Sequence, residues 1–250
     1  MITITTNQQI EDFTRGCCFF ATGGGGDPLF GQQMLREAMD AGKQICIIDA
    51  KELSGEAWTI CPYLMGPAPG PETETVKQAR KEYGLTQEVI SNMPAAAAQL
   101  LLEQEEIRLS AVIPLELGAA ATSGAVATAA WLGVPTIDGD YAGRALPEVA
   151  QILPAIHNVN LLPIASCDRY GNQIIIKNDR SAHDRTPRQD HVYCIIGFGR
   201  SGNLIKATET NEIGHVIEYL VKSIVCRYSF ERSAGSKRQL SSINNRIDSR

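Results

Sequence analysis

The chain of 250 residues begins with segments whose apolar positions alternate between strand and helix patterns. The short apolar run at residues 16–21 (GCCFFA) predicts a buried strand. Asp27-Pro28 then has the features of a helix start, because Asp caps the first amides and Pro fits the first turn. Apolar residues recur at helical spacing as far as Met39, and Gly42 provides a stop. The run at residues 44–49 (QICIID) predicts the next strand.

The same alternation continues to about residue 156. Residues 64–71 (LMGPAPGP) are rich in Pro and Gly and predict a loop. The remaining predicted elements are, in order, helices at 72–83 and 94–108, a strand at 111–115 that Pro114 ends or places at an edge, a helix that Thr122 or Ser123 caps and Gly133 closes after Leu132, a strand at 134–137, and a helix at 147–156. Strands that alternate with helices predict an α/β fold, with a parallel sheet covered by helices on both faces in three layers.

The pattern changes after about residue 161. Short strands are predicted at 162–165, 173–177, 191–198 and 203–208, with a turn at Gly171-Asn172. The sequence therefore predicts three parts: an α/β ligand-binding domain at 1–161, a smaller β-rich domain at 162–225, and a flexible basic tail at 226–250. The pattern G-x-G-x-x-G at 197–202 is followed by a predicted strand rather than a helix, which favours a hairpin turn over a dinucleotide site.

Ligands of parallel sheets bind beyond the carboxyl ends of the strands. Applied to the predicted strands, that rule gathers residues 23–27, Asp49, residues 116–123 and residues 138–144 at one edge. Candidate binding and catalytic residues are therefore expected in these segments.

The first candidate is the run Gly23, Gly24, Gly25 and Gly26, followed by Asp27. The backbone amides of such a turn, at the start of a helix, can bind a phosphate, a carboxylate or a developing oxyanion. No Gly-Lys-Ser/Thr follows, so the run is not a P-loop. Asp27 competes for the same amides as an N-cap. The alternative is a sharp turn with close packing of the backbone.

The second candidate is Asp138-Gly139-Asp140, with Arg144 and Glu148 after it. Two carboxylates separated by one residue at a strand end can act as base and orienter, or bind a divalent metal ion. Arg144 can bind a carboxylate of the substrate in a bidentate manner. The alternative is a solvated turn in which Arg144 pairs with Glu148. Glu116, after another predicted strand, adds a third carboxylate to the same edge.

Composition limits the classes of function. The formal net charge is -5, and no block of Lys and Arg suggests a nucleic-acid partner. No apolar run is long enough for a membrane span, and the N-terminal residues do not resemble a signal peptide. The seven cysteines form no C-x-x-C pair and the four histidines have no metal-ligand spacing, which favours reduced thiols and a cytoplasmic location.

Residues 21–28, 65–68, 116–118 and 138–148 together resemble the S-methyl thiohydantoin desulfurase-like family, often found near hydantoinase- and oxoprolinase-type proteins. The resemblance covers residues 16–156 and extends more faintly beyond. It implies an α/β domain followed by a barrel-like β domain, and hydrolytic removal of sulfur from a thiohydantoin-type ring. The segment that begins with Glu116 and ends at Thr122 is called the acid loop. After Gly118 this chain has Ala119 to Thr122 there, where the family tends to have a second glycine and an asparagine. Its C-terminal part is shorter than usual for the family, so the second domain is expected to be incomplete.

The leading hypothesis is a hydrolase that acts on a small thiohydantoin- or hydantoin-type ring. Asp138 or Asp140 would be the general base or would hold a divalent metal ion, and Glu116 would position water or the ring N–H. The amides of the glycine run would stabilise developing charge, and Arg144 would orient an anionic substituent. The alternatives are a non-catalytic accessory subunit or truncated ligand-binding relic of a hydantoinase-like system, and a nucleotide-binding oxidoreductase. The expected partners are a small-molecule substrate and a second copy of the chain or a hydantoinase-type protein.

Overall fold

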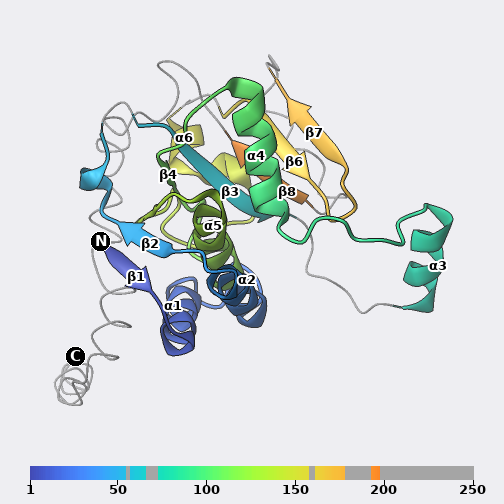
Figure 1. The fold of residues 1–250 in the computed structure, drawn as a ribbon, viewed down its shortest axis with the longest axis horizontal. Coiled ribbons are helices and arrows are strands. Elements are labelled where there is room, and N and C mark those ends of the chain that lie inside the picture. The colour runs from blue at the N-terminus through green and yellow to red at the C-terminus, as the bar shows by residue number, and fades with distance from the viewer. Residues whose placement is uncertain (55–56, 66–72, 158–160, 178–192, 198–250) are drawn as a thin grey trace.

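The computed structural model describes residues 1–54, 57–65, 73–157, 161–177 and 193–197 (Figure 1). Within these ranges the strands form one sheet in the order β1-β2-β5-β4-β3-β8-β6-β7. The strands are β1 (Ile2–Ile4), β2 (Ile45–Ile48), β3 (Thr59–Met65), β4 (Ala111–Val112), β5 (Thr136–Ile137), β6 (Ile164–Cys167), β7 (Gln173–Ile176) and β8 (Tyr193–Gly197). The helices are α1 (Asn7–Phe20), α2 (Pro28–Asp40), α3 (Glu74–Glu82), α4 (Met93–Glu105), α5 (Ala119–Leu132) and α6 (Leu153–Ile156), with 3-10 turns at Ala50–Glu52 and Val149–Gln151.

The centre of the sheet is parallel. Strands β2, β5, β4 and β3 run in the same direction, with Ile48 opposite Ile137 and Val112 opposite Thr136. Strand β1 pairs antiparallel at one end, and β8, β6 and β7 pair antiparallel at the other. The predicted α/β class with a parallel central sheet is confirmed.

The strands predicted after residue 161 correspond to β6, β7 and β8. Strand β8 joins the central sheet through β3, where Cys61 lies opposite Gly197. The separate β-rich domain at 162–225 stays a prediction, because much of that range lies outside the described residues. The strand at 203–208, the glycine-rich turn beyond Gly197 and the tail at 226–250 also lie outside them.

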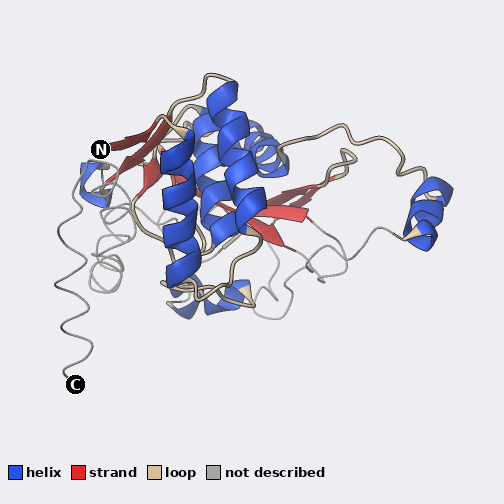
Figure 2. Cartoon of the chain, turned by 90° about the horizontal axis from the view of Figure 1, so that it is seen from below, coloured by secondary structure: helices blue, strands red, loops and turns tan. Residues whose placement is uncertain are grey.

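Helix α5 is the central helix of the fold. Eleven of its residues are buried, and nearly all of them are small. Gly124 shows why, because a Cβ atom there would lie only 3.2 Å from the Cε of Met34 on α2. Larger side chains would separate α5 from α1, α2 and the sheet. Figure 2 shows the long helices packed side by side over the strands.

Different elements pack against the two faces of the sheet. On the helical face, residues of α1, α2 and α5 form a buried cluster with strand β2 that includes Ile10, Leu35 and Ile47. On the opposite face, Ile113 and Ile137 pack with side chains from residues 141–155. Both faces of the parallel strands are therefore buried, as expected for a parallel sheet. No described helix is both long and apolar enough to cross a membrane.

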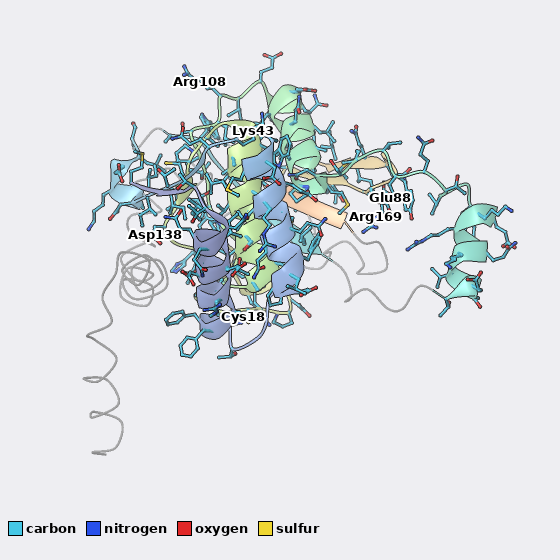
Figure 3. All side chains as sticks on the ribbon, turned by 60° about the horizontal axis from the view of Figure 1, so that its bottom comes forward. Cys18, Lys43, Glu88, Arg108, Asp138 and Arg169 are labelled. Carbon is cyan, nitrogen blue, oxygen red and sulfur yellow. The ribbon has the colours of Figure 1, made fainter. Side chains whose placement is uncertain are left out.

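Helix α3 projects away from the rest of the described chain and buries none of its residues (Figures 1 and 2). The segment that follows it returns to the sheet at the turn between β6 and β7. There the amides of Val89 and Ile90 both donate to the carbonyl of Arg169, at 2.9 and 3.1 Å. Glu88 also pairs with Arg169 at 2.8 Å (Figure 3). This exposed pair lies well away from Asp138 in Figure 3.

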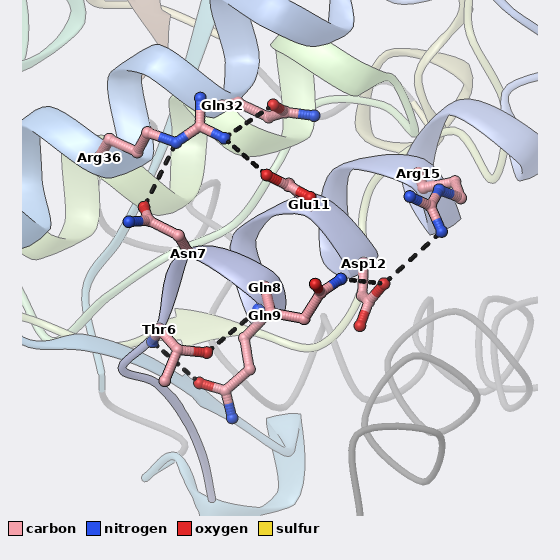
Figure 4. Close-up of polar contacts among 9 residues, drawn as sticks. All are labelled: Thr6, Asn7, Gln8, Gln9, Glu11, Asp12, Arg15, Gln32 and Arg36. Carbon is pink, nitrogen blue, oxygen red and sulfur yellow. Dashed lines mark hydrogen bonds and ion pairs between the residues drawn. The ribbon is translucent and has the colours of Figure 1, made fainter.

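The strand predicted at residues 16–21 is wrong, because these residues form the last turn of α1. Thr6 caps this helix, and its side chain forms a reciprocal capping box with Gln9 (Figure 4). Ile10, Phe13 and Cys17 then follow at helical spacing and are buried. The apolar run misleads because only its inward side is buried: Phe19 is 74% exposed. The glycine run therefore joins two helices.

A polar network connects α1 with α2. The guanidinium of Arg36 on α2 donates to Asn7 at 3.3 Å and to Glu11 at 3.1 Å, both on α1 (Figure 4). It also donates to Gln32 one turn earlier on its own helix, at 3.1 Å. These contacts are exposed or only partly buried, so the buried apolar faces make the larger contribution to packing.

Several predicted boundaries differ from the structure. The helix expected to begin at Thr122 or Ser123 begins at Ala119, with Gly118 as its N-cap. The helix predicted at 147–156 is two short elements, Val149–Gln151 and α6, because Pro154 lacks the N–H that a continuous helix needs. The predictions for α2, β2, α3 and α4 are confirmed to within about three residues at each described end.

Candidate functional site

Three of the predicted segments meet in the structure, although the glycine run follows helix α1 rather than the predicted strand. The amide of Leu146 donates to Oε2 of Glu116 at 2.7 Å. This bond joins the acid loop, which follows β4, to the Asp138–Glu148 block, which follows β5. A Cβ atom on Gly24 would lie 2.5 Å from Cβ of Ala145, so the glycine run lies against the same block. Asp49 is exposed after β2 and caps the 3-10 turn Ala50–Glu52.

The glycine run packs its backbone directly on the acid loop. A Cβ atom on Gly25 would lie 2.2 Å from Cα of Gly118, and one on Gly26 would lie 2.8 Å from Cβ of Ala120. The φ angles of Gly25 and Gly26 are +75° and +89°, which side chains also disfavour. Close backbone packing, one of the two interpretations of the run, is therefore present.

The run also supplies the N-terminal cap of α5. The carbonyl oxygen of Gly25 accepts from the amides of Ala120 and Ala121, at 3.0 and 2.9 Å. Gly118, the N-cap residue, has no side chain that could do this. The first amides of a helix usually donate to the side chain of its N-cap residue. Here they donate instead to the backbone of a residue more than ninety positions earlier in the chain.

The amides of the run divide into two pairs. Those of Gly23 and Gly24 donate to the carbonyls of Cys18 and Ala21, at 3.0 and 2.9 Å. The amides of Gly25 and Gly26 donate no hydrogen bond within the described part of the chain. Asp27 is exposed, and its Oδ1 accepts from the amide of Leu29 at 3.0 Å, so its predicted role as the cap of α2 is confirmed.

Glu116 is partly buried, and one of its two carboxylate oxygens is fixed. Burial raises the pKa of this carboxyl, and the nearby charge of Asp140 raises it further. The hydrogen bond from Leu146 and the charge of Arg144 act in the opposite direction. Its Oε1 atom makes no hydrogen bond within the described part of the chain.

Asp140 is only 2% exposed. Its Oδ1 accepts from the amides of Ala142, at 2.7 Å, and of Gly143. Its Oδ2 is buried and makes no hydrogen bond to any described residue. Burial raises the pKa of this carboxyl to about 6, although the two amides act to lower it. A buried carboxylate with an unsatisfied oxygen is costly, and such groups are concentrated at functional sites.

Asp138 and Arg144 lie in more exposed positions. Asp138 follows β5 on the surface, and its amide donates to the carbonyl of Ile48 at 2.8 Å (Figure 3). Arg144 donates to the carbonyl of Ala145 at 3.1 Å and to Gln151 at 3.5 Å, rather than to Glu148. The two carboxylates of the Asp138-Gly139-Asp140 motif therefore have opposite environments, one on the surface and one in the interior.

The described residues do not fit the divalent metal ion considered from the sequence. Nowhere in the described ranges do three or more His, Cys, Asp or Glu side chains form a group that could hold one. One oxygen of Asp140 is also already bound to two amides. The five cysteines whose side chains are described are free thiols.

Sequence reasoning treated Thr122 only as a helix cap and did not place Cys17 or Cys61 near the site. Thr122 lies inside α5, where its hydroxyl contacts the acid loop. Burial raises the pKa of Cys17 to about 12, although a hydrogen bond with Thr122 lowers it, and the charge of Asp140 raises the pKa of both cysteines. The capping box Thr6-x-x-Gln9 was the signal for α1, and hence for the inward direction of Cys17.

A family model matches the part of the chain that contains these residues. The model of the family described as "S-Me-THD-like, N-terminal domain" matches residues 8–178. The chain belongs to the S-Me-THD-like family. The matched range contains the glycine run, the acid loop and the Asp138–Glu148 block of this S-Me-THD-like protein.

A solved structure shows a similar fold. The crystal structure of a protein from Chromobacterium violaceum superposes with a TM-score of 0.59 at 18% sequence identity, covering 96% of this chain and 67% of that one. At this identity the likeness concerns the fold alone. No curated protein matches the sequence of this S-Me-THD-like protein.

Proposed function

We propose that this protein is a hydrolase that removes sulfur from a small cyclic thiohydantoin-type ring by attack of water. Its membership of the S-Me-THD-like family suggests a related function. The observation that carries the proposal is the similar state of two partly or fully buried carboxyl groups that interact electrostatically, those of Glu116 and Asp140. In each carboxyl group one oxygen accepts from backbone, one amide for Glu116 and two for Asp140, and the other oxygen has no hydrogen bond among the described residues.

The two carboxyl groups suit different steps. Glu116 is the more exposed of the two, so it is the general base that takes a proton from water. Asp140, with a pKa near 6, exists partly in its protonated form near neutral pH and can hold or return a proton. Asp138, on the surface, is outside this pair, which changes the order of candidates drawn from the sequence.

The proposed reaction balances without a further reactant. Water attacks the ring carbon that carries sulfur, a C–O bond forms, and the carboxylate of Glu116 takes one proton. The adduct's hydroxyl proton and the proton held by Glu116 then pass to sulfur as the C–S bond breaks. Both hydrogens of the attacking water thus leave in hydrogen sulfide, and both carboxyl groups return to their starting state. The ring keeps a carbonyl group, so a thiohydantoin gives a hydantoin.

In the proposed reaction the amides of Gly25 and Gly26 stabilise the negative charge that develops on sulfur or oxygen. They are chosen because they donate no hydrogen bond within the described part of the chain. Loss of one such donor typically costs about 3 kcal/mol in the barrier. The exposed guanidinium of Arg144 is available to an anionic substituent of the ring.

The test is direct. Purified protein is mixed with thiohydantoins and hydantoins, and hydrogen sulfide and ring absorbance are followed. Turnover should be lost in Glu116→Gln and Asp140→Asn, and retained in Glu88→Gln, which changes an exposed carboxylate remote from the pair. Turnover that survives both site substitutions would refute the assignment. Binding without turnover in the wild-type protein would favour an accessory subunit or a ligand-binding relic.

A further inference from the structure

We infer that Thr122 is a positioning residue for the proposed chemistry, because its hydroxyl fixes the turn that carries Glu116. The inference rests on the proposed function, since it concerns the same site. Thr122 contacts neither the Asp140 carboxyl nor the Glu116 carboxyl in any described hydrogen bond. It acts instead on the backbone between β4 and α5.

The hydroxyl of Thr122 closes the turn at both ends. Its Oγ1 accepts from the amide of Gly118 at 2.9 Å and donates to the carbonyl of Glu116 at 3.0 Å. One side chain therefore uses both its donor and an acceptor site on the short segment from Glu116 to Gly118. Thr122 is only 7% exposed, so water does not readily replace it in these bonds.

The helix itself does not need this hydroxyl. The amide of Thr122 already donates to the carbonyl of Gly118 at 2.9 Å, and the Gly25 carbonyl binds the amides of Ala120 and Ala121. The first turn of α5 is therefore hydrogen-bonded without it. Besides its contact with Cys17, the hydroxyl serves the amide of Gly118 and the carbonyl of Glu116, which would otherwise lack this partner.

The consequence reaches the carboxylate through the turn. If the turn rotates to find new partners for those two backbone groups, the Glu116 side chain moves with it. Its bond with the amide of Leu146 would then lengthen or break, and its electrostatic interaction with Asp140 would change. Misplacement by about 1 Å is enough to cost about 100-fold in rate at a catalytic site.

The same helix offers a matched control. Thr128 is fully buried, and its hydroxyl donates to the carbonyl of Gly124 at 2.8 Å. It lies six residues, nearly two helical turns, further along α5 and makes no contact with the acid loop in the described hydrogen bonds. Thr128→Val therefore removes a buried hydroxyl from α5 without touching the turn.

The experiment compares Thr122→Val, Thr122→Ser and Thr128→Val in the full chain. The carboxyl of Glu116 is titrated by carbon-13 NMR, with its signal assigned by its absence in Glu116→Gln. In Thr122→Val the pKa of Glu116 should rise, because its bond with Leu146 is weakened, and the amide of Leu146 should exchange faster with solvent. Thr122→Ser keeps the hydroxyl and should titrate like the wild type, as should Thr128→Val.

Kinetics give a second readout. With a thiohydantoin that is turned over, Thr122→Val should lower kcat about 100-fold, with KM within about twofold. An unchanged Glu116 titration in Thr122→Val, or an equal change in Thr128→Val, would overturn the inference. If Thr122→Val does not fold, a Thr122→Ser variant whose Glu116 titration departs from wild type would also overturn it, and an unchanged one would support it. Absence of turnover in the wild type would refute the proposed function alone, because the titration does not need a substrate.

Discussion

Replacement of Asp140 by Asn should stabilise the protein at neutral and alkaline pH. In the wild type, one carboxylate oxygen of Asp140 is buried without a hydrogen bond among the described residues. An asparagine can keep the bonds from Ala142 and Gly143 through its carbonyl oxygen, and it places no charge in the interior. If Asp140 takes part in the chemistry, the same substitution removes activity, so stability and function should change in opposite directions.

The magnitude follows from the pKa. Burial raises the pKa of Asp140 from 3.8 to about 6, so folding favours its protonated form. The stabilisation that comes from this preference for the protonated carboxyl is fully present below about pH 4 and is lost as the pH rises through about 6. A difference of about two in pKa corresponds to about 3 kcal/mol, at about 1.4 kcal/mol for each pH unit. The advantage of Asn should therefore be small near pH 4 and approach about 3 kcal/mol at pH 8.

Denaturant unfolding at pH 4 and pH 8 measures this directly. Asp168→Asn is the matched comparison, because Asp168 is also buried and its Oδ1 accepts from two amides, those of Tyr170 and Asn172. Its second oxygen, unlike that of Asp140, accepts from the side chain of Asn172 at 2.6 Å. Asp168→Asn would set two amide groups against each other and should destabilise the protein. Equal stability of wild type and Asp140→Asn at pH 8 would refute the reasoning.

Three further predictions concern the elements that hold the site. Gly25→Ala should lower the free energy of unfolding by about 3 kcal/mol, because a Cβ atom there collides with Gly118. In Gly23→Ala the new Cβ atom has no neighbour within 4 Å, so the loss should be about 1 kcal/mol, from the positive φ angle alone. Equal losses of stability in thermal melts of the two variants would contradict this. Thr6→Ala removes the capping box of α1 and should cost about 1 kcal/mol by denaturant unfolding, with no loss indicating that the cap is dispensable. Cys17, buried with a pKa near 12, should resist alkylation at pH 8 until the protein unfolds, and mass spectrometry showing rapid labelling of the native protein would disprove that.

Local sequence patterns were sufficient to predict a helix where residues at both of its ends have the chemistry of a cap or a stop. Asp27-Pro28 begins α2 and Gly42 follows its end, as their chemistry predicts. The failure at residues 16–21 has an equally local cause. Hydrophobicity alone does not distinguish a buried strand from the last turn of a helix, and the decisive capping box lies ten residues earlier, at Thr6 and Gln9.

The nearness of two of the candidate segments was predicted correctly from the sequence. Because parallel strands end at the same edge, the rule for such sheets placed Glu116 near the block that contains Asp140, and the contact between Glu116 and Leu146 bears this out. The rule cannot rank the two aspartates, because they follow the same strand and differ only in burial. It also gave no reason to single out Thr122, whose partners depend on the path of the turn.

By itself, the sequence determined the α/β class, most of the elements and the nearness of Glu116 to the segment after β5, since these follow from short-range periodicity and turn chemistry. Only the tertiary structure decided that Gly25 caps α5, that Asp140 is buried while Asp138 is exposed, and that Thr122 holds the acid loop. The physical reason is the same in each case. Burial and hydrogen bonds between distant segments depend on how the whole chain packs, and no local spacing of residues records it.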